Sequence, residues 1–399
     1  MSDPSPAAPI LTPPSGEQLD LAALRRYRLD RFTAEMTAAG VDLAVLTNPV
    51  SLRYVADWRE YLPYQSHIPT YTLFVDRDGD LTLNGAYGAR HEVIDRFGPT
   101  HGLNGFDGGL DQAKRVERFV ADVTGVVGSG ARVALEPLNP SAALALDIAG
   151  FDVVDAEPLI ERAKYVKSAE ELVCIRHSIS VAEAALGLMR DVEPGVTENQ
   201  LFAILHLTNI ANDGDWIDGR MLCSGPRTNP WYQQSTDRVV NAGDLVAVDT
   251  DMIGPFGYTA DISRTWVAGS VTPTDDQRDR YRRAHEEIHH NAALLEPGRT
   301  FRELIDKSFR QPEEFVANRY TCLAHGVGMA DEYPRIVYPQ DWEREGYDGV
   351  IEVGAVLTVE SFVGSDRGGP GVKLEDMYHI TESGPVRLSS FPFEEDLLA

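Results

Sequence analysis

The chain has 399 residues, of which 62 are Asp or Glu and 36 are Lys or Arg, so its formal net charge is −26 at neutral pH. This surplus of negative charge repels nucleic acid and anionic membranes, and we expect neither as a partner. We expect no signal peptide or membrane span, because the first residues lack a basic start and no apolar run approaches roughly 20 residues. Three widely separated cysteines argue against a disulfide framework and suit a cytoplasmic protein.

The first 165 residues predict an arm and a small α/β domain. Residues 1–17 are rich in Pro, Ser and Ala without periodicity, which is typical of a mobile arm. For the domain at 18–165 the pattern predicts, in chain order, a helix at 31–39, a strand at 42–46, a hairpin at 70–75 and 81–83, and a strand at 132–135.

A capping box opens the second domain, which we place at 166–399. Ser168 followed by Glu171 predicts the start of a long amphipathic helix that runs to about residue 192. Farther on, a weak repeat appears: PGVT at 194–197 recurs as PGRT at 297–300, each with a threonine suited to an N-cap. The run GDLVAVD at 243–249 likewise recurs as GAVLTVE at 354–360. The repeat predicts two α+β halves around a pseudo-twofold axis, which would bring Asp249 and Glu360 together.

Charged side chains stand where these apolar strands end. A buried strand should not end in carboxylates unless they are paired or bind a cation, because an unpaired buried charge is costly. Asp249 and Asp251, two residues apart, would share one face of a strand, and Asp261 would lie on the strand that returns. The second half offers Glu360 and Glu375.

His325 completes this set as its single imidazole. Five carboxylates and one imidazole suit two divalent transition-metal ions, with iron favoured and manganese, zinc and cobalt as alternatives. Taken singly, each carboxylate is more often a capped strand end or a surface charge, and it is the whole set that favours a metal centre.

The motifs VDTDMIGPFGYTADISRT, HGVG, GAVLTVES and GVKLED resemble those of the M24 metallopeptidases. The resemblance covers about 165–399 and implies an α+β pita-bread domain, as in prolidases, Xaa-Pro aminopeptidases and creatinases, behind a smaller α/β N-terminal domain. It implies that Asp249 ligates one ion, that His325 and Glu360 ligate the other, and that Asp261 and Glu375 bridge both. Asp251 is an addition to the usual five ligands.

Two positions depart from the peptidase pattern. M24 peptidases place two further histidines beside the metals, and here those positions carry Trp231, in SGPRTNPW, and Glu332, in MADEYP. Neither side chain can act as a neutral imidazole does. The metal site is therefore predicted to persist while the reaction has changed.

These variants, with Asp251 and the C-terminal FPFEEDLL, are similar to the dimethylsulfoniopropionate lyases of the DddP type. That resemblance implies that Asp331 removes an α-proton from a small carboxylate substrate, and that dimethyl sulfide leaves to give acrylate. Tyr320 and Trp231 would offer aromatic faces to the sulfonium. In the alternative reading, Asp331 only bonds to its own loop and both aromatic rings belong to the core.

Three functions stay open: the lyase, an M24 hydrolase acting on Xaa-Pro or other C–N bonds, and a metal-free binding module. The complete ligand set argues against the module, and Trp231 with Glu332 favours the lyase over the hydrolase. The resemblance also implies a homodimer, to whose active sites the loop at 57–65 would contribute.

Two other motifs are set aside. The sequence HEEIH at 285–289 fits the H-E-x-x-H template, but its polar surroundings do not suit a buried zinc helix. The run GVVGSG at 125–130 precedes a strand and is a turn, not a phosphate loop.

Overall fold

The computed structural model of the chain describes residues 10–11, 18–59, 62–86, 90–98, 103–104 and 108–399. It separates into two compact units, one of residues 20–164 and the other of residues 165–399 with 1–19. The predicted arm at 1–17 lies outside the described residues except for Ile10 and Leu11, and the backbone amide of Leu11 donates to Asn212 Oδ1 at 2.7 Å.

The N-terminal unit is built on a six-stranded mixed sheet with the order β4-β3-β2-β1-β5-β6. The predicted helix, hairpin and strands are confirmed, although α1 begins ten residues earlier than expected and several short elements were not predicted. The sheet and helices bury one apolar core. The strands are β1 (Leu43–Leu46), β2 (Thr72–Asp76), β3 (Leu81–Asn84), β4 (Arg96–Phe97), β5 (Arg132–Leu135) and β6 (Asp152–Asp155). The helices are α1 (Leu21–Ala38), α2 (Pro49–Ala56), α3 (Leu62–His67), α4 (Gln112–Val127), α5 (Pro140–Ile148) and α6 (Glu157–Tyr165).

The C-terminal unit repeats a helix-pair-and-sheet arrangement, as the internal repeat predicts. Its first half comprises α7 (Ala169–Arg190), α8 (Glu198–Ala211), β7 (Trp216–Ile217), β8 (Leu222–Ser224), β9 (Leu245–Asp249), β10 (Met252–Ile253), β11 (Thr259–Ala260) and β12 (Ser263–Val267). Its second half comprises α9 (Asp275–Ala292), α10 (Phe301–Lys307), α11 (Glu313–Val316), β13 (Ala324–Val327), β14 (Asp331–Ile336), α12 (Trp342–Glu345), β15 (Val356–Gly364), β16 (Gly371–Thr381), β17 (Gly384–Arg387) and α13 (Glu395–Leu398).

Capping explains where these helices begin. Ser168, Thr197, Thr274 and Thr300 each close a complete capping box with the residue three positions later, so the predicted N-caps at Ser168, Thr197 and Thr300 are confirmed. Each cap satisfies two backbone amides that the first helical turn would otherwise leave unbonded.

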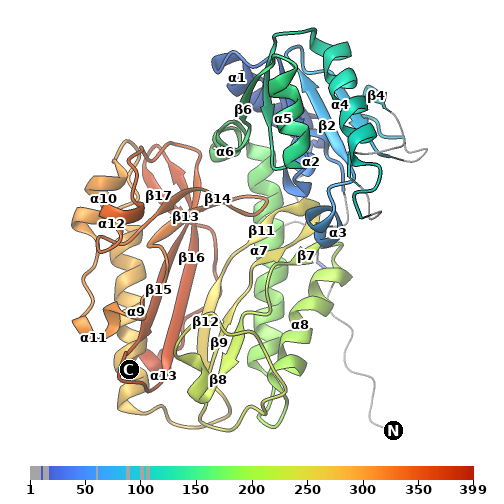
Figure 1. Ribbon diagram of the computed structural model, residues 1–399. Helices are drawn as coiled ribbons and strands as arrows, with labels where there is room; N and C mark the ends of the chain where they lie inside the picture. Colours follow the sequence, from blue (N-terminus) through green and yellow to red (C-terminus); the bar gives the residue numbers. More distant parts are fainter. Residues whose placement is uncertain (1–9, 12–17, 60–61, 87–89, 99–102, 105–107) are drawn as a thin grey trace, which may run out of the picture. The chain divides into compact units, whose positions relative to one another are not determined.

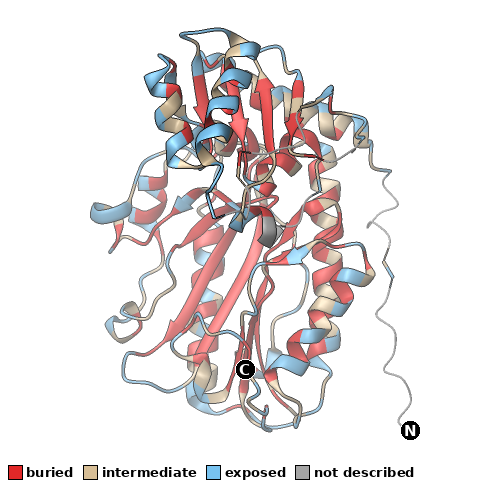
Figure 2. Ribbon diagram, turned by 45° about the vertical axis from the view of Figure 1, so that its right-hand side comes forward, coloured by how far each residue is buried: buried red, intermediate tan, exposed pale blue. Residues whose placement is uncertain are grey.

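Two sheets meet in the middle of the unit. One has the order β12-β9-β8 and the other β14-β13-β15-β16-β17, with α7 and α8 along the first and α9 along the second (Figure 1). Thr265 on β12 joins them, since its hydroxyl donates to Lys373 O on β16 and accepts from Lys373 N. Every residue of β15 is buried, and the long strands of the second sheet stand out as buried in Figure 2.

One described helix, α7, is long and apolar enough to cross a membrane by length and composition. It is instead a core helix of this unit, since 61% of its most apolar window is buried. Its buried face carries Cys174, Ile175, Ile179 and Leu186, among others.

Candidate metal centre

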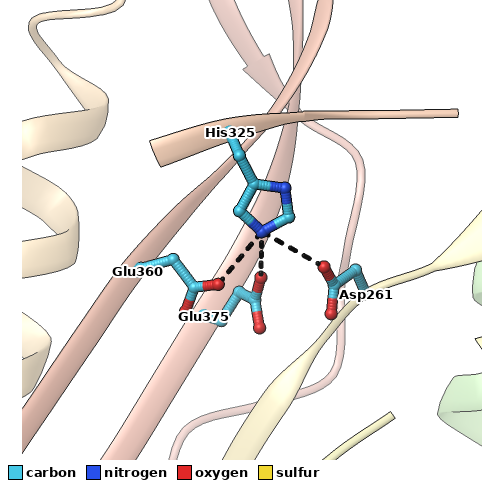
Figure 3. Close-up of side chains that lie close together, drawn as sticks. All are labelled: Asp261, His325, Glu360 and Glu375. Atoms are coloured by element: carbon cyan, nitrogen blue, oxygen red, sulfur yellow. Dashed lines mark hydrogen bonds and ion pairs between the residues drawn. The ribbon is translucent and has the colours of Figure 1, made fainter. Parts of the chain in front are cut away.

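In the second half of the C-terminal unit, the three predicted ligands lie on regular strands. Glu360 on β15 lies directly opposite Glu375 on β16, and His325 on β13 lies opposite Thr358 on β15. Figure 3 shows that the His325 ring points at three carboxylates, with Nε2 at 3.2 Å from Glu360, 3.5 Å from Asp261 and 3.9 Å from Glu375. The other ring nitrogen, Nδ1, lies 3.0 Å from the Gly326 carbonyl, which leaves Nε2 as the ligand atom.

In the first half, two of the three predicted ligands lie on irregular backbone, so two expectations are wrong. Asp251 was predicted on the same strand as Asp249, but β9 ends at Asp249 and Asp251 has φ of +35°. Asp261 was predicted on the returning strand, yet it lies between β11 and β12. Aspartate tolerates the left-handed region better than most residues, so the chain can turn sharply here toward β10.

Despite this irregularity, the structure brings all six predicted ligands together. One ligand atom from each of Asp261, His325, Glu360 and Glu375 lies within 4.8 Å of the others. The same holds for Asp249, Asp251 and Asp261, so Asp261 belongs to both groups. That shared position is what a carboxylate between two ions requires.

The six predicted ligands together form a metal cage, whose electrostatics suit a cation. Burial, and then the neighbouring carboxylates Glu375 and Asp249, hold the pKa of Asp261 well above its usual range. Burial and the charge of Glu375 likewise raise the pKa of Glu360 to about 8. The buried Oδ1 atoms of Asp249 and Asp261 have no hydrogen-bond partner among the described residues. Crowded acidic oxygens without donors are what divalent ions satisfy, so the residues present fit a metal centre.

Lys373 contacts the metal cage, and the sequence analysis did not predict this contact. Its ammonium lies 3.0 Å from Asp249 Oδ2, 2.5 Å from Glu360 Oε2 and 3.1 Å from Glu375 Oε2, and its side chain is fully buried. It also donates to Ser263 Oγ at 2.7 Å. Burial alone would lower the pKa of Lys373, but the three carboxylates hold it well above its usual value.

The lysine orients the ligands. Glu360 and Glu375 each turn Oε2 toward Lys373 and Oε1 toward His325, and Asp249 turns Oδ2 toward the lysine and keeps Oδ1 free of it. A signal for this role was present: Lys373 stands two residues before Glu375 on a strand, and therefore on the same face.

Asp331, the predicted base, begins β14 and is exposed to solvent. Burial alone would lower the pKa of His325, but the charge of Asp331, together with Glu360 and Glu375, raises it to about 10. Asp331 also contributes to the raised pKa of Asp251 and of Asp261. Its carboxylate therefore stands at the rim of the cage.

The two positions where peptidases carry histidine are both occupied by buried side chains. Glu332 is turned away from the cage, with Oε2 at 2.8 Å from Lys167 Nζ and Oε1 accepting from the Met329 amide at 2.8 Å. Trp231 packs with Cys223, Ala247 and Phe362 in a small core cluster. Neither place therefore holds an imidazole, and the Glu332 carboxylate is bound to Lys167 and to the Met329 amide.

An aromatic wall adjoins the cage. Tyr320 stacks on Tyr232 with ring centroids 5.2 Å apart, and the Lys373 ammonium lies 4.5 Å from the Tyr320 centroid and 5.8 Å from that of Trp231. Tyr232 was not predicted to be part of the site. It has a left-handed backbone, with φ of +69°, and its hydroxyl pairs with that of Thr321 at 2.9 Å.

The H-E-x-x-H motif at 285–289 does not belong to the predicted metal centre. His285 and His289 lie side by side on α9 with ring centroids 4.0 Å apart, and both contact Phe393. Arg264 and Arg387 stack on the same Phe393 ring, so the neighbourhood is already cationic.

The fold and this site define a class of protein. The sequence model of metallopeptidase family M24 matches residues 173–382, and the chain belongs to that family. Xaa-Pro dipeptidase from Bacillus anthracis has a similar structure, with a TM-score of 0.74 over 93% of this chain and 99% of that chain at 20% identity. Prolidase from Pyrococcus furiosus superimposes with a TM-score of 0.68 over 90% of this chain and 99% of that chain, at 21% identity. These likenesses establish the pita-bread fold. Family M24 enzymes depend on divalent metal ions, which the cage of this chain is built to hold.

Within the family, the chain belongs with proteins described as dimethylsulfoniopropionate lyase DddP. The protein of that name from Roseovarius nubinhibens is 33% identical over 396 residues, which cover 95% of this chain and 88% of that protein. A second one, from Roseobacter denitrificans, is 32% identical with the same coverage. By contrast, an Xaa-Pro dipeptidase from Pyrococcus furiosus is 28% identical over only 58% of this chain.

Proposed function

We propose that this chain is a metal-dependent carbon–sulfur lyase that cleaves dimethylsulfoniopropionate to dimethyl sulfide and acrylate. The observation that carries the proposal is the pairing of a metal cage with Asp331 at its rim, while Trp231 and Glu332 stand where M24 hydrolases need histidines. The relatives at 33% and 32% identity bear the name of that lyase.

The reaction needs one base and one leaving group. The Asp331 carboxylate takes the proton from the carbon next to the substrate carboxylate. The electron pair of that C–H bond becomes the second bond of acrylate, the bond from the β-carbon to sulfur breaks, and dimethyl sulfide leaves neutral with its electron pair. No water is consumed, so the missing histidines are not needed. Divalent ions on the cage residues supply Lewis acidity that makes the α-proton more acidic.

The aromatic wall would contact the substrate, although the structure modifies the role that sequence suggests for Trp231 and Tyr320. One side of Tyr320 stacks on Tyr232, and Lys373 supplies a cation to the same wall. A sulfonium would therefore share these rings with an ammonium and would gain less from them than an isolated aromatic cage provides.

We further propose two divalent ions, with iron favoured, at these six residues. The five carboxylates, less the charge of Lys373, leave four negative charges, which two divalent ions balance. An oxygen-rich set with a single imidazole suits iron or manganese better than zinc. Elemental analysis of the purified protein should give close to two ions per chain, and active protein without metal would refute the proposal.

A homodimer and a cytoplasmic location are also proposed. The three cysteines are free and buried, as in a reducing compartment, and the resemblance to M24 enzymes supports the dimer. Light scattering should give twice the 44.0 kDa of one chain. A fully active monomer would exclude a shared active site, including any contribution from the loop at 57–65.

The decisive experiment measures headspace dimethyl sulfide and proline release on the same preparation. We expect dimethyl sulfide from dimethylsulfoniopropionate and no proline from Xaa-Pro dipeptides. Asp331→Asn keeps the shape of the side chain and removes the basic oxygen, so the rate should fall by roughly a hundred- to ten-thousandfold at unchanged metal content. Proline release by the wild type without dimethyl sulfide would favour the hydrolase instead.

A further inference from the structure

The turn that carries Asp331 is fixed from the metal side. The β13–β14 hairpin reverses at 328–330, where the Gly328 amide bonds to the Ala330 carbonyl at 3.2 Å. The Gly328 carbonyl in turn accepts from the Thr259 amide at 2.7 Å, two residues before the ligand Asp261. The hairpin tip is therefore tied to the first half of the cage through a backbone hydrogen bond.

A buried ion pair fixes the same turn from the opposite side. Lys167 Nζ and Glu332 Oε2 are 2.8 Å apart, and each side chain is 1% exposed. Glu332 Oε1 accepts from the Met329 amide at 2.8 Å, inside the turn. Since Asp331 and Glu332 are adjacent on a strand, their side chains leave it on opposite faces, one toward the rim and one toward the lysine.

Two further features of the structure keep Glu332 and Lys167 in this arrangement. A Cβ on Gly328 would lie 2.5 Å from Glu332 Oε2, so the carboxylate takes its place only because residue 328 is a glycine. The backbone amide of Lys167 donates to the Gly354 carbonyl at 2.9 Å, just before β15, the strand that carries Glu360. The lysine thus links the hairpin to the second half of the cage.

We propose that Lys167 and Glu332 are a positioning pair, which holds the Asp331 carboxylate at the distance from the metal cage that proton removal requires. The inference rests on the proposed function, in which Asp331 is the base. Removing one partner of a buried ion pair leaves an uncompensated charge, whereas replacing both partners does not. A misplacement of about 1 Å in a catalytic group can cost on the order of a hundredfold in rate.

The test compares Lys167→Met, Glu332→Gln and the double variant, with Lys164→Met as the control. Lys164 is another buried lysine, paired with Glu161 at 2.5 Å in the N-terminal unit. We expect Lys167→Met to lower kcat for dimethylsulfoniopropionate by roughly ten- to a hundredfold, with KM within about threefold and metal content unchanged. The double variant should recover most of the loss, because its buried charges are removed together. Lys164→Met should leave kcat unchanged.

Hydrogen exchange of the Met329 amide gives a readout that does not depend on activity. We expect faster exchange in Lys167→Met and little change in Glu332→Gln, which keeps an oxygen acceptor. If the wild type releases no dimethyl sulfide, the proposed function fails, and the exchange data still decide whether the pair holds the turn. Should Lys167→Met fold poorly, Glu332→Gln decides alone, with a partial loss of kcat expected.

Three results would overturn the positioning role. The first is an unchanged kcat in folded Lys167→Met, and the second is a double variant no better than that single variant. The third is an inactive Glu332→Gln with a protected Met329 amide, because Glu332 itself would then be the base. Loss of metal from either variant would also count against it, since the pair would then belong to the cage.

Discussion

In the half of the C-terminal unit that contains β13, β15 and β16, His325, Glu360 and Glu375 all stand on regular strands in fixed register. In the half that contains β9, Asp249 alone stands on a strand, while Asp251 and Asp261 leave irregular backbone. The same contrast appears in the hydrogen bonds. Both oxygens of Glu375 have partners in Thr358, Ser263 and Lys373, whereas Asp249 Oδ1 and Asp261 Oδ1 have none among the described residues.

This difference separates a preformed part of the cage from a part that a cation completes. Cross-strand neighbours hold the ligands of the second half, and Lys373 pairs with Glu360 and Glu375 there as well as with Asp249. The first half has oxygens whose burial is favourable only with a positive charge beside them, so metal binding and local folding are linked there.

The largest effect is expected from Glu375, which faces His325 on one side and Lys373 on the other. Glu375→Ala should abolish binding of both ions and lower activity by on the order of a thousandfold or more, because the resemblance to M24 enzymes implies that Glu375 bridges the two ions. Asp249→Ala should cost one ion. Metal analysis beside activity measures both, and Glu382→Ala, at an exposed position in the turn between β16 and β17, is the control. Two ions in Glu375→Ala would show that the second half is not the organising part.

The next prediction concerns pH and metal removal. Burial raises the pKa of Glu360 to about 8 from an ordinary 4.5, and raises that of Asp261 well above its usual range. A carboxyl with a raised pKa in the folded state favours folding while protonated, and that contribution is lost as pH rises through the folded pKa. Burial would raise the pKa of Glu375 as well, but Lys373 and His325 hold it well below its usual value, so Glu375 contributes a constant amount above pH 5.

Protein treated with a chelator should therefore lose stability between about pH 5 and pH 8. Metal-loaded protein should lose much less, because bound cations keep the carboxylates ionised and favoured. Thermal melting of both forms across this range measures the difference, and we expect the gap in Tm to widen as pH rises. A difference in Tm that stays constant with pH would mean that Glu360 and Asp261 are not protonated in the metal-free protein.

A smaller effect is expected at Asp251, the additional ligand with left-handed backbone. Asp251→Asn keeps the conformation, since asparagine also tolerates positive φ, but removes one charge. The affinity for one ion should fall by roughly ten- to a hundredfold, as is usual when a supporting group of a metal site is lost. Asp213→Asn is a matched control, because Asp213 also has positive φ, at +63°, and is exposed. Equal losses in both variants would indicate a backbone effect.

The same division explains what sequence could predict. An apolar run that ends in a carboxylate, and a helix that begins with a capping box, are local signals, so the ligand set and the start of α7 follow from the chain itself. Asp251 was misplaced because its sharp turn follows from tertiary pairing of β10. The pair of Lys167 with Glu332 was missed for a related reason, because its partners lie 165 residues apart and nothing local connects them. Lys373 did have a local signal, its place two residues before Glu375.

The smallest effect is expected where the two halves meet in the aromatic wall, since Tyr232 comes from the first half and Tyr320 from the second. The Tyr232 hydroxyl bonds to Thr321, next to Tyr320, and so fixes the stacked pair. Tyr232→Phe removes one hydrogen bond and keeps the ring, which corresponds to about 1 kcal/mol, or roughly fivefold. We expect this loss in KM for dimethylsulfoniopropionate, with kcat and metal content unchanged, because Tyr232 stacks on Tyr320 in the proposed substrate-binding wall and is not one of the predicted metal ligands. Tyr347→Phe, in the stacked pair with Tyr333, is the control. A fall in kcat at constant KM would instead show that the wall positions the reacting atoms, and that the first half contributes to catalysis beyond its metal ligands.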